Sequence, residues 1–445
     1  MDISELTNIT EKLMKKLKAK GIDDIVLHSG IGSEYQTKFT NSRIVKTEVS
    51  SAASISVFCN WNGKIIETTL KDANEKGIGR LVGNLEKYVR YIPKNEKFEG
   101  IAEGPFKYGK LNYDKKLENP ERIIADSIET AIAAAERNGG ERNSGVMETK
   151  TSKTYLLTSG NCEVEDRDSE IYFSFRSICD KESSGHKVYA ARSLKGFNPK
   201  KLAKEAAQFA SDSKGDKAEV MGQFDVVFEP LPLAIMLEHI GDSTSAFEVE
   251  SGNSFLKDKL NKKVGSKVFN LTDDPLLNDG YGSTTFDSEG VKTRKTELIK
   301  NGVLKTYVHN TSTAKRAKTK TTGNAGLISP HPWNIVLEKG KLSREKLISN
   351  VDNGIYVTNA WYMRFHNYLT GEFSIIPRDA IFLIKNGRID KPVKNVRLNA
   401  SLQELMEKTE KIGNNTEKIH SWEVGGSVIT PSILARDIKI TKPTS

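Results

Sequence analysis

Two stretches, TELIKNGVLKTYV at residues 296–308 and AIFLIKNGRIDKPV at residues 380–393, each hold an Asn-Gly pair between alternating apolar residues. Asn and Gly tolerate positive φ at both central positions of a two-residue turn, so this pattern is the strongest local signal for a β-hairpin. A helix is predicted shortly before them in PLPLAIMLEHIGD, residues 230–242, opened by Pro232. Two hairpins and a helix favour an α+β domain built on antiparallel sheet. No regular strand–helix alternation runs through this half, which disfavours a doubly wound parallel sheet.

The first half of the chain mixes helix and strand signals. Apolar residues from Leu6 to Leu17 fall on one face and predict an N-terminal amphipathic helix, with Ser4 as N-cap and Gly21 as its end. An Ala-rich run over residues 119–138 predicts a second helix, in which Asn119 caps and Pro120 occupies the first turn. A third helix is expected over residues 198–210, and short strands at residues 23–28, 53–58, 153–158 and 169–178.

The polar, glycine-containing segment SDSKGDKAEVMG, residues 211–222, is the best candidate for a linker. A chain of 445 residues is long enough for two domains, each with its own core. We therefore expect a mixed α+β N-terminal domain over residues 1–219 and a C-terminal domain rich in antiparallel sheet over residues 220–445.

The composition, with 37% hydrophobic and 28% charged residues, is that of an ordinary globular protein. No apolar run reaches the roughly 18 residues that a membrane span needs. The N-terminus carries acids from residue 2 and lacks an apolar core, so we expect no signal peptide. Three scattered cysteines, Cys59, Cys162 and Cys179, exclude a disulfide framework and a zinc ribbon. The cytoplasm is the expected compartment.

The net charge of +9 raises the alternative of nucleic-acid binding. The Lys and Arg residues are dispersed, however, and the densest cluster contains no aromatic residue that could stack on a base. That cluster is predicted to be a solvated loop after a strand, and nucleic acid is a disfavoured partner. The cluster consists of Lys315, Arg316, Lys318 and Lys320.

The residues alone do not reveal a catalytic site. None of the histidines forms an HExxH or HxxxH pair, and the chain has neither a GxSxG elbow nor a phosphate-binding loop. Glu238 and His239 are adjacent on the predicted helix, but neighbours on a helix point about 100° apart and would not converge on one metal. His331 between two prolines is expected in a rigid turn, and His309 has no evident partner. The remaining histidines are His28, His186, His366 and His420.

The C-terminal half resembles the TldD/PmbA family, once called modulators of DNA gyrase. The resemblance rests on an ordered set of motifs between roughly residues 225 and 440: PLPLAIMLEHIGD, DDPLLNDGYGSTTFDSEG, LIKNGVLKTYVHN, LTGEFSIIPRDAIFLIKNGRID and GGSVITPSILARDIKI. It implies the two-domain TldD/PmbA-like architecture. The N-terminal half shows the resemblance more loosely.

The resemblance also implies where a metal site would lie. The TldD-type member resembles a zinc peptidase with HExxxH on a helix and a cysteine near the C-terminus. On this chain the two histidine positions fall at Leu237 and Asp242, the glutamate at Glu238 and the cysteine near Ser421. A leucine cannot bind metal, and no cysteine follows Cys179. We therefore expect no catalytic residue, no metal and no cofactor in this chain, with Glu238 as a remnant or a packing residue.

Loss of these ligands resembles the PmbA/TldE branch. It implies a non-catalytic subunit of a heterodimeric zinc metallopeptidase that degrades unfolded or extended peptides, with zinc in a TldD-type partner. A peptide could be held as a strand added to a sheet edge, and a homodimer without the partner is left open. Two alternatives stand beside it: a metallopeptidase with a divergent site of His239, Asp242 and His420, and a modulator associated with DNA or a topoisomerase.

Overall fold

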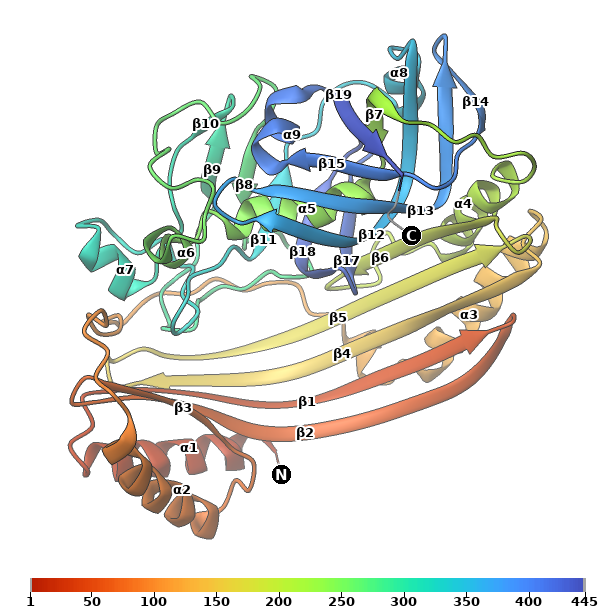
Figure 1. The fold of residues 1–445 in the computed structure, drawn as a ribbon. Helices are drawn as coiled ribbons and strands as arrows, with labels where there is room; N and C mark the ends of the chain where they lie inside the picture. Colours follow the sequence, from red (N-terminus) through yellow and green to blue (C-terminus); the bar gives the residue numbers. More distant parts are fainter. Residues whose placement is uncertain (1, 443–445) are drawn as a thin grey trace.

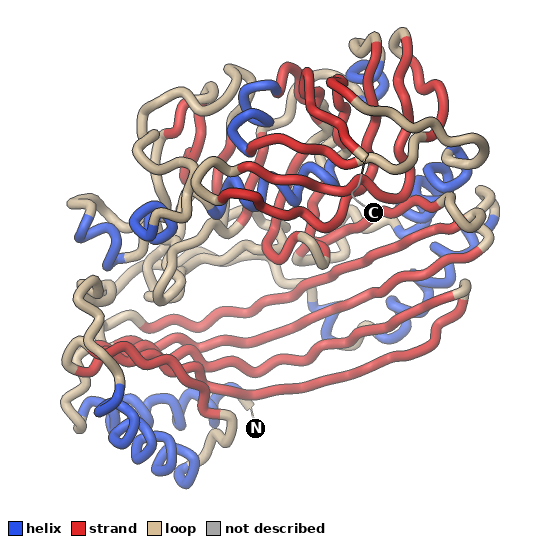
Figure 2. The backbone as a smooth tube through the Cα atoms, in the orientation of Figure 1, coloured by secondary structure: helices blue, strands red, loops and turns tan. Residues whose placement is uncertain are grey.

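The computed structural model describes residues 2–442, which fold into three β-sheets with helices packed against them (Figures 1 and 2). The expected α+β class is confirmed. A long six-stranded antiparallel sheet forms the lower layer in Figure 1, and the two sheets of the C-terminal half lie above it.

The long sheet has the strand order β3-β2-β1-β4-β5-β6. Helices α1 and α2 pack at one end of it and α3 and α4 at the other, each pair over its own apolar cluster (Figure 1). The strands are β1 (Asp24–Thr40), β2 (Arg43–Trp61), β3 (Lys64–Leu70), β4 (Arg142–Thr158), β5 (Glu163–Ile178) and β6 (Ser184–Ala191). The helices are α1 (Ile3–Lys18), α2 (Glu75–Tyr88), α3 (Glu121–Glu136) and α4 (Pro199–Asp212), with 3-10 turns η1 (Val89–Tyr91) and η2 (Lys115–Glu118).

The N-caps of α1 and α3 differ from those predicted. Asp2, not Ser4, caps α1, because its carboxylate accepts from the Glu5 backbone N–H while Glu5 reaches back to complete a capping box. The first residue of α3 is Glu121, and Pro120 rather than Asn119 occupies its N-cap position. The helix expected over residues 198–210 is α4, and Asn198 is its N-cap.

Both predicted hairpins are present in the C-terminal half. Asn301 and Gly302, and Asn386 and Gly387, all have positive φ between 48° and 74°, as a tight two-residue turn requires. The first hairpin belongs to a sheet of order β10-β9-β8-β11-β18-β17. Its strands are β8 (Leu271–Asp273), β9 (Thr296–Lys300), β10 (Val303–Leu304), β11 (Asn334–Leu337), β17 (Glu417–Ser421) and β18 (Val424–Thr430).

The second hairpin belongs to a sheet of order β12-β7-β19-β15-β13-β14, in which β12 also pairs with β13 and so closes five strands into a ring. Most pairs are antiparallel, as expected, but β7–β12 and β11–β18 are parallel. The strands are β7 (Gly222–Phe228), β12 (Asn353–Asn367), β13 (Glu372–Lys385), β14 (Arg388–Pro392), β15 (Arg397–Ser401) and β19 (Ile433–Thr441), with β16 (Thr409–Ile412) beside β19.

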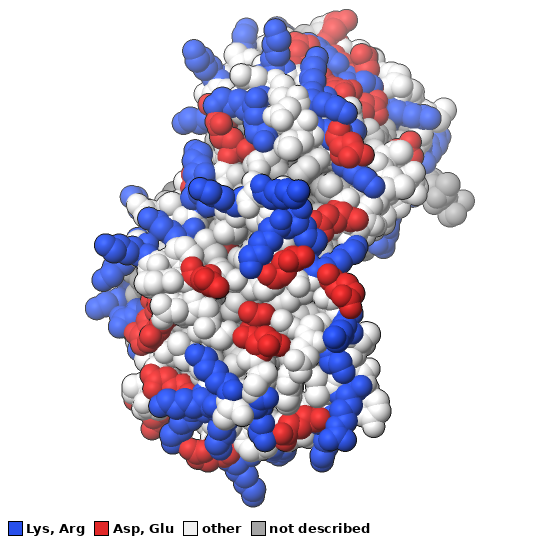
Figure 3. Space-filling model, turned by 90° about the vertical axis from the view of Figure 1, so that its left-hand side faces the viewer, with Lys and Arg blue, Asp and Glu red and all other residues white. Residues whose placement is uncertain are grey.

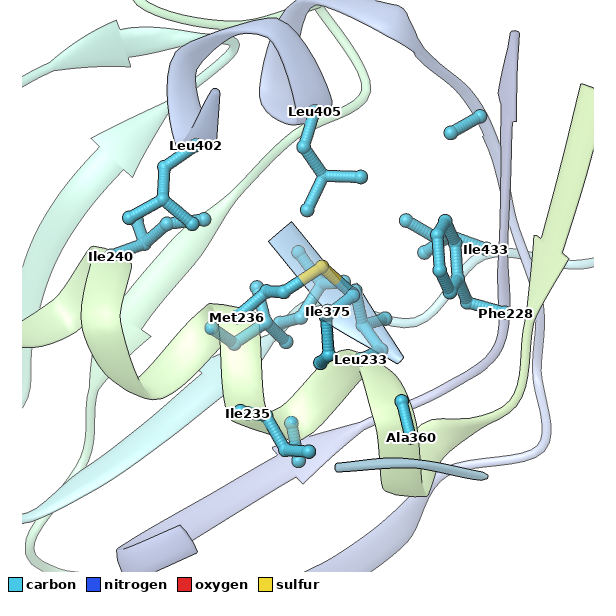
Figure 4. Close-up of a cluster of buried hydrophobic side chains, with 14 of the residues drawn as sticks. Phe228, Leu233, Ile235, Met236, Ile240, Ala360, Ile375, Leu402, Leu405 and Ile433 are labelled. Carbon is cyan, nitrogen blue, oxygen red and sulfur yellow. The ribbon is translucent and has the colours of Figure 1, made fainter. Parts of the chain in front are cut away.

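Helix α5 (Pro230–Asp242) is buried on nearly all sides in the C-terminal half. It begins at Pro230, two residues before the expected start, with Glu229 as N-cap. Apolar side chains of α5 meet those of β7, β19 and α9 in one cluster (Figure 4). Gly241 is needed at its end, since an added Cβ would lie 2.2 Å from Cδ1 of Ile335. The other helices are short: α6 (Ala246–Ser251), α7 (Thr311–Arg316), α8 (Arg344–Ile348) and α9 (Leu402–Lys408).

The basic cluster after β10 is a solvated loop only in its second half, where Lys318 and Lys320 are exposed outside any helix. Lys315 and Arg316 end helix α7, and both are engaged: Lys315 Nζ donates to the Glu99 carbonyl at 2.8 Å, and Arg316 pairs with Glu250 at 2.6 Å. On the face shown in Figure 3, Lys and Arg alternate with Asp and Glu rather than forming a single basic stripe. Within residues 2–442, no helix combines the length and the apolarity needed to cross a membrane.

The two halves share a core. Tyr172 of β5 and Val188 of β6 belong to the same apolar cluster as Leu233 of α5. The long sheet and the C-terminal sheets are therefore packed directly against each other, and the division at residue 220 stays a prediction.

Candidate functional site

The four positions that the sequence singled out lie on two neighbouring elements. Helix α5 carries Leu237, Glu238 and Asp242, and it packs against the β17–β18 hairpin, which carries Ser421. Residues 230–237 of α5 are apolar and buried, which explains this placement, because such a helical segment is stable only when other elements enclose it. The structure thus brings the helix and the hairpin together.

Two of these positions offer nothing to a metal ion. Leu237 is 0% exposed and belongs to the apolar cluster around α5. Ser421 is buried at the end of β17, where it pairs with Val424 across the hairpin. A leucine side chain has no donor atom, and a neutral serine hydroxyl is a poor substitute for a zinc-bound thiolate.

The carboxylate of Glu238 is held by the backbone of β18. Its Oε1 accepts from the Gly426 N–H at 2.6 Å. Burial raises the pKa of Glu238, and the N–H groups of Gly426 and Gly425 act against that shift by favouring the charged form. The Gly426 carbonyl in turn accepts from Nδ1 of His420 at 2.9 Å. Glu238 therefore occupies a structural position between helix and hairpin.

A recess of about 270 Å³ opens beside the C-terminal end of α5. Asp242 is exposed to water in this recess although protein surrounds it on most sides, and none of residues 2–442 donates a hydrogen bond to its carboxylate. This enclosure, together with the nearby carboxylates of Glu238 and Glu248, raises the pKa of Asp242 to about 7. The lining comprises His239, Asp242, Ser243, Ser245, Glu248, Asn253, Phe255, Ser329, Pro330, His331, Phe365 and Tyr368.

The alternative site of His239, Asp242 and His420 is only partly assembled. His239 shares the recess with Asp242, and its ring meets Phe365 edge-on at 5.0 Å. His420 does not line the recess, because its ring stacks on Tyr281 at a centroid distance of 4.4 Å. Burial lowers the pKa of both histidines. Among the residues from 2 to 442, no three or more His, Cys, Asp or Glu side chains are grouped so as to hold a metal ion.

Two other histidines have roles that the sequence did not reveal. His309 is buried and its Nδ1 lies 3.2 Å from Oγ1 of Thr313, a partner that was not evident from the sequence. His331 packs edge-on against Trp333 at 4.6 Å and forms part of the recess wall.

A buried ion cluster at the start of α5 was not predicted from the sequence. Lys187 of β6 is 3% exposed and its Nζ lies 3.7 Å from both Glu229 and Glu205, with Glu417 closer still. Arg344 also lies 3.7 Å from the same carboxylate oxygen of Glu229. Lysine in an alternating strand looks like an exposed residue, so no signal marked it. The cluster ties the N-cap of α5 to the long sheet.

The donors present do not fit a zinc site. Asp242 supplies one carboxylate, Glu238 is already hydrogen-bonded to the hairpin, and Leu237 and Ser421 stand where the resemblance leads us to expect the other two ligands. A structural or catalytic zinc site needs three or four converging N, S or O ligands.

Comparisons with known proteins agree with this reading of the fold. Residues 221–442 match the PmbA/TldA metallopeptidase C-terminal domain and residues 109–214 the central domain of the same family. A metalloprotease of Methanocaldococcus jannaschii is 23% identical to this chain, and the match covers 92% of this chain and 93% of that protein.

Two solved structures share the fold. A Thermotoga maritima protein named as a modulator of DNA gyrase is 23% identical and has a TM-score of 0.85, covering 98% of this chain and 100% of that one. TldE from Thermococcus kodakarensis is 20% identical with a TM-score of 0.84, covering 96% and 100%.

Proposed function

Because the chain belongs to the PmbA/TldD metallopeptidase family, we propose that it is the non-catalytic, TldE-like subunit of a heterodimeric zinc metallopeptidase that degrades unfolded or extended peptides. Its partner is a TldD-type subunit, which holds the zinc, and the complex works in the cytoplasm. The observation that carries the proposal is the burial of Leu237, at 0% exposure, where the family's zinc site requires a ligand.

The state of Glu238 supports the same proposal. In a zinc peptidase the glutamate must reach a metal-bound water as general base. Here Glu238 Oε1 accepts a 2.6 Å hydrogen bond from the Gly426 N–H, which anchors the β18 backbone to α5. The carboxylate of Glu238 therefore joins helix α5 to strand β18.

The likeness to TldE from Thermococcus kodakarensis extends over 96% of this chain, which includes both the long sheet and the C-terminal half. A subunit that contributes binding surfaces but no catalytic residues is expected to keep the whole fold. The positions of its zinc ligands can then be occupied by residues that do not bind metal. Those surfaces include the recess of about 270 Å³ that the carboxylates of Asp242 and Glu248 line.

The test is reconstitution with a TldD-type protein from the same organism. We expect the mixture to elute as one complex and to cleave a denatured casein faster than the TldD-type protein alone. A Glu238→Gln variant should reconstitute to the same activity, because this glutamate has no part in the chemistry. If no complex elutes and the activity never exceeds that of the partner alone, the proposal fails.

A further inference from the structure

A second recess, of about 490 Å³, lies where the long sheet meets the C-terminal half. Sites for small molecules typically span about 300–1,000 Å³, so this space is large enough for one. Its wall comes from strands β5, β12 and β13, the β5–β6 and β14–β15 loops and the linker before β7 (Figure 1). We call it the junction recess, because both halves of the chain build it.

The wall of the junction recess carries more cations than anions. Five basic side chains line it, against the carboxylates of Glu182 and Asp379. Among residues 2–442, an ion pair to one of these five is found only at Arg176, whose Nε lies 3.3 Å from Oδ1 of Asp379. Four cations therefore line the space without a carboxylate partner. The basic residues are Arg176, Lys181, Lys217, Arg378 and Lys394.

The carboxylate of Asp379 is already engaged inside the protein. Its Oδ1 accepts from Oγ of Ser184 and its Oδ2 from Nδ2 of Asn359, both at 2.6 Å. Asp379 has a φ of 57° and lies where β13 shifts its register against β12. A bulge of this kind redirects side chains. It leaves Asp379 only 4% exposed, while the side chain of the preceding Arg378 is exposed at the recess.

Two of the unpaired lysines are held near each other by the backbone. The linker forms a parallel bridge between Ala218 and Val393, beside which the Lys394 N–H donates to the Ala218 carbonyl at 2.9 Å. The bridge residues pack on the apolar cluster around α5, so the lysines one position away, Lys217 and Lys394, point to the opposite face. Burial lowers the pKa of Lys217, and the charge of Lys394 acts in the same direction.

One indole ring lies next to both arginines. The guanidinium carbon of Arg176 lies 4.2 Å from the ring centroid of Trp361, and that of Arg378 lies 5.8 Å from it. A cation–π contact orients a guanidinium and leaves N–H groups at its edge free to bind an anion. The junction recess thus combines two guanidinium groups with three ammonium groups.

We propose that the junction recess binds a chain of two or more linked phosphates, either free or carried by a nucleotide. A terminal phosphate carries about −1.5 to −2 charges at pH 7, so more than one phosphate is needed to balance four unpaired cations. Arginine binds phosphate through paired N–H groups and lysine binds it as a point charge, and the recess offers both. A single carboxylate would leave most of these cations unpaired. This inference does not depend on the proposed peptidase role.

Isothermal titration calorimetry on the isolated full-length chain tests the proposal. We expect sodium tripolyphosphate and ATP, each without a divalent cation, to bind with a Kd on the order of 100 µM or below in about 50 mM salt. Inorganic phosphate should bind at least about tenfold more weakly, and added salt should weaken all three. Equal affinities for tripolyphosphate and ATP would identify the phosphate chain as the whole ligand, whereas tighter binding of ATP would show that the nucleoside adds contacts.

Paired substitutions locate the binding. Lys181→Gln/Lys394→Gln removes two exposed cations of the recess and should weaken tripolyphosphate binding by about tenfold or more. Lys257→Gln/Lys267→Gln is the matched control, because it removes the same charge from two exposed lysines outside the recess. The control should change the affinity by less than about twofold. Thermal melting close to that of the wild type, expected because all four lysines are exposed, shows that both variants are folded.

The inference is overturned if tripolyphosphate does not bind the wild-type chain. It is also overturned if both double variants weaken binding equally, because the attraction would then come from the overall positive charge of +9. Phosphate that binds as tightly as tripolyphosphate would contradict recognition of a chain of phosphates. A peptide rich in aspartate that binds more tightly than tripolyphosphate would assign the recess to acidic peptides instead.

Discussion

The carboxylate of Glu238 and the backbone N–H of Gly426 are joined by a 2.6 Å hydrogen bond between helix α5 and strand β18. The glutamate that would serve as base in a zinc peptidase of this family is thus an anchor in this chain. Gly426 permits the approach, since a Cβ there would lie 3.1 Å from Glu238 Oε1.

Removing this anchor should affect stability more than activity. Glu238→Gln keeps an oxygen that accepts from Gly426, whereas Glu238→Ala leaves the N–H to water and should cost about 1 kcal/mol of unfolding free energy, measured by urea denaturation. In the reconstituted complex both variants should retain most of the peptidase activity. A loss of a hundredfold or more with Glu238→Gln is the signature of a general base and would refute the anchor role.

The packing of Leu237 leads to a second prediction. Leu237→Ala should lower the free energy of unfolding by about 2–5 kcal/mol, because it opens a cavity in the cluster around α5. Leu260→Ala is the matched control; its leucine is 43% exposed, and the change should cost less than about 1 kcal/mol. Equal, small effects of the two changes would mean that the helix is not packed as described.

Asp242 should make stability depend on pH. Its folded-state pKa of about 7 lies above the ordinary value of 3.8, so the native chain binds more protons than the unfolded chain between these values. The contribution of Asp242 to stability therefore falls as the pH rises from about 4 to 7. Asp242→Asn should be more stable than wild type at pH 8, and the advantage should shrink towards pH 5. Urea denaturation at both pH values measures the difference in unfolding free energy between the variant and the wild type. A stability advantage of Asp242→Asn that grows as the pH falls would contradict this prediction.

The buried Lys187 should contribute strongly to stability, because it joins the long sheet to the C-terminal half. Lys187→Met leaves the carboxylate of Glu417 without its cation and Glu229 with Arg344 alone, and it should cost about 3–5 kcal/mol. Adding Glu417→Gln should recover part of this loss, because one buried charge is removed. Lys201→Met, at an exposed end of the same network, should change stability by less than about 0.5 kcal/mol. A Lys187→Met chain as stable as wild type would contradict the role of the cluster.

The features that can be predicted from the sequence are those determined by residues close together in the chain. The turns at Asn301-Gly302 and Asn386-Gly387 follow from residues that accept positive φ, and α5 follows from its apolar run. The length of β2 could not be predicted, because residues 43–52 are exposed on both faces and show no alternation. The contacts of Glu238 depend on a hairpin 188 residues further along the chain, which no local pattern encodes.

The zinc content of the purified heterodimer and of its separated chains shows which subunit holds the metal. We expect the complex of this chain with a TldD-type partner to contain zinc, the separated TldD-type chain to retain it, and this chain alone to contain none. Stoichiometric zinc on this chain that is lost in a His239→Ala variant would refute the non-catalytic role and favour a divergent metal site in its place.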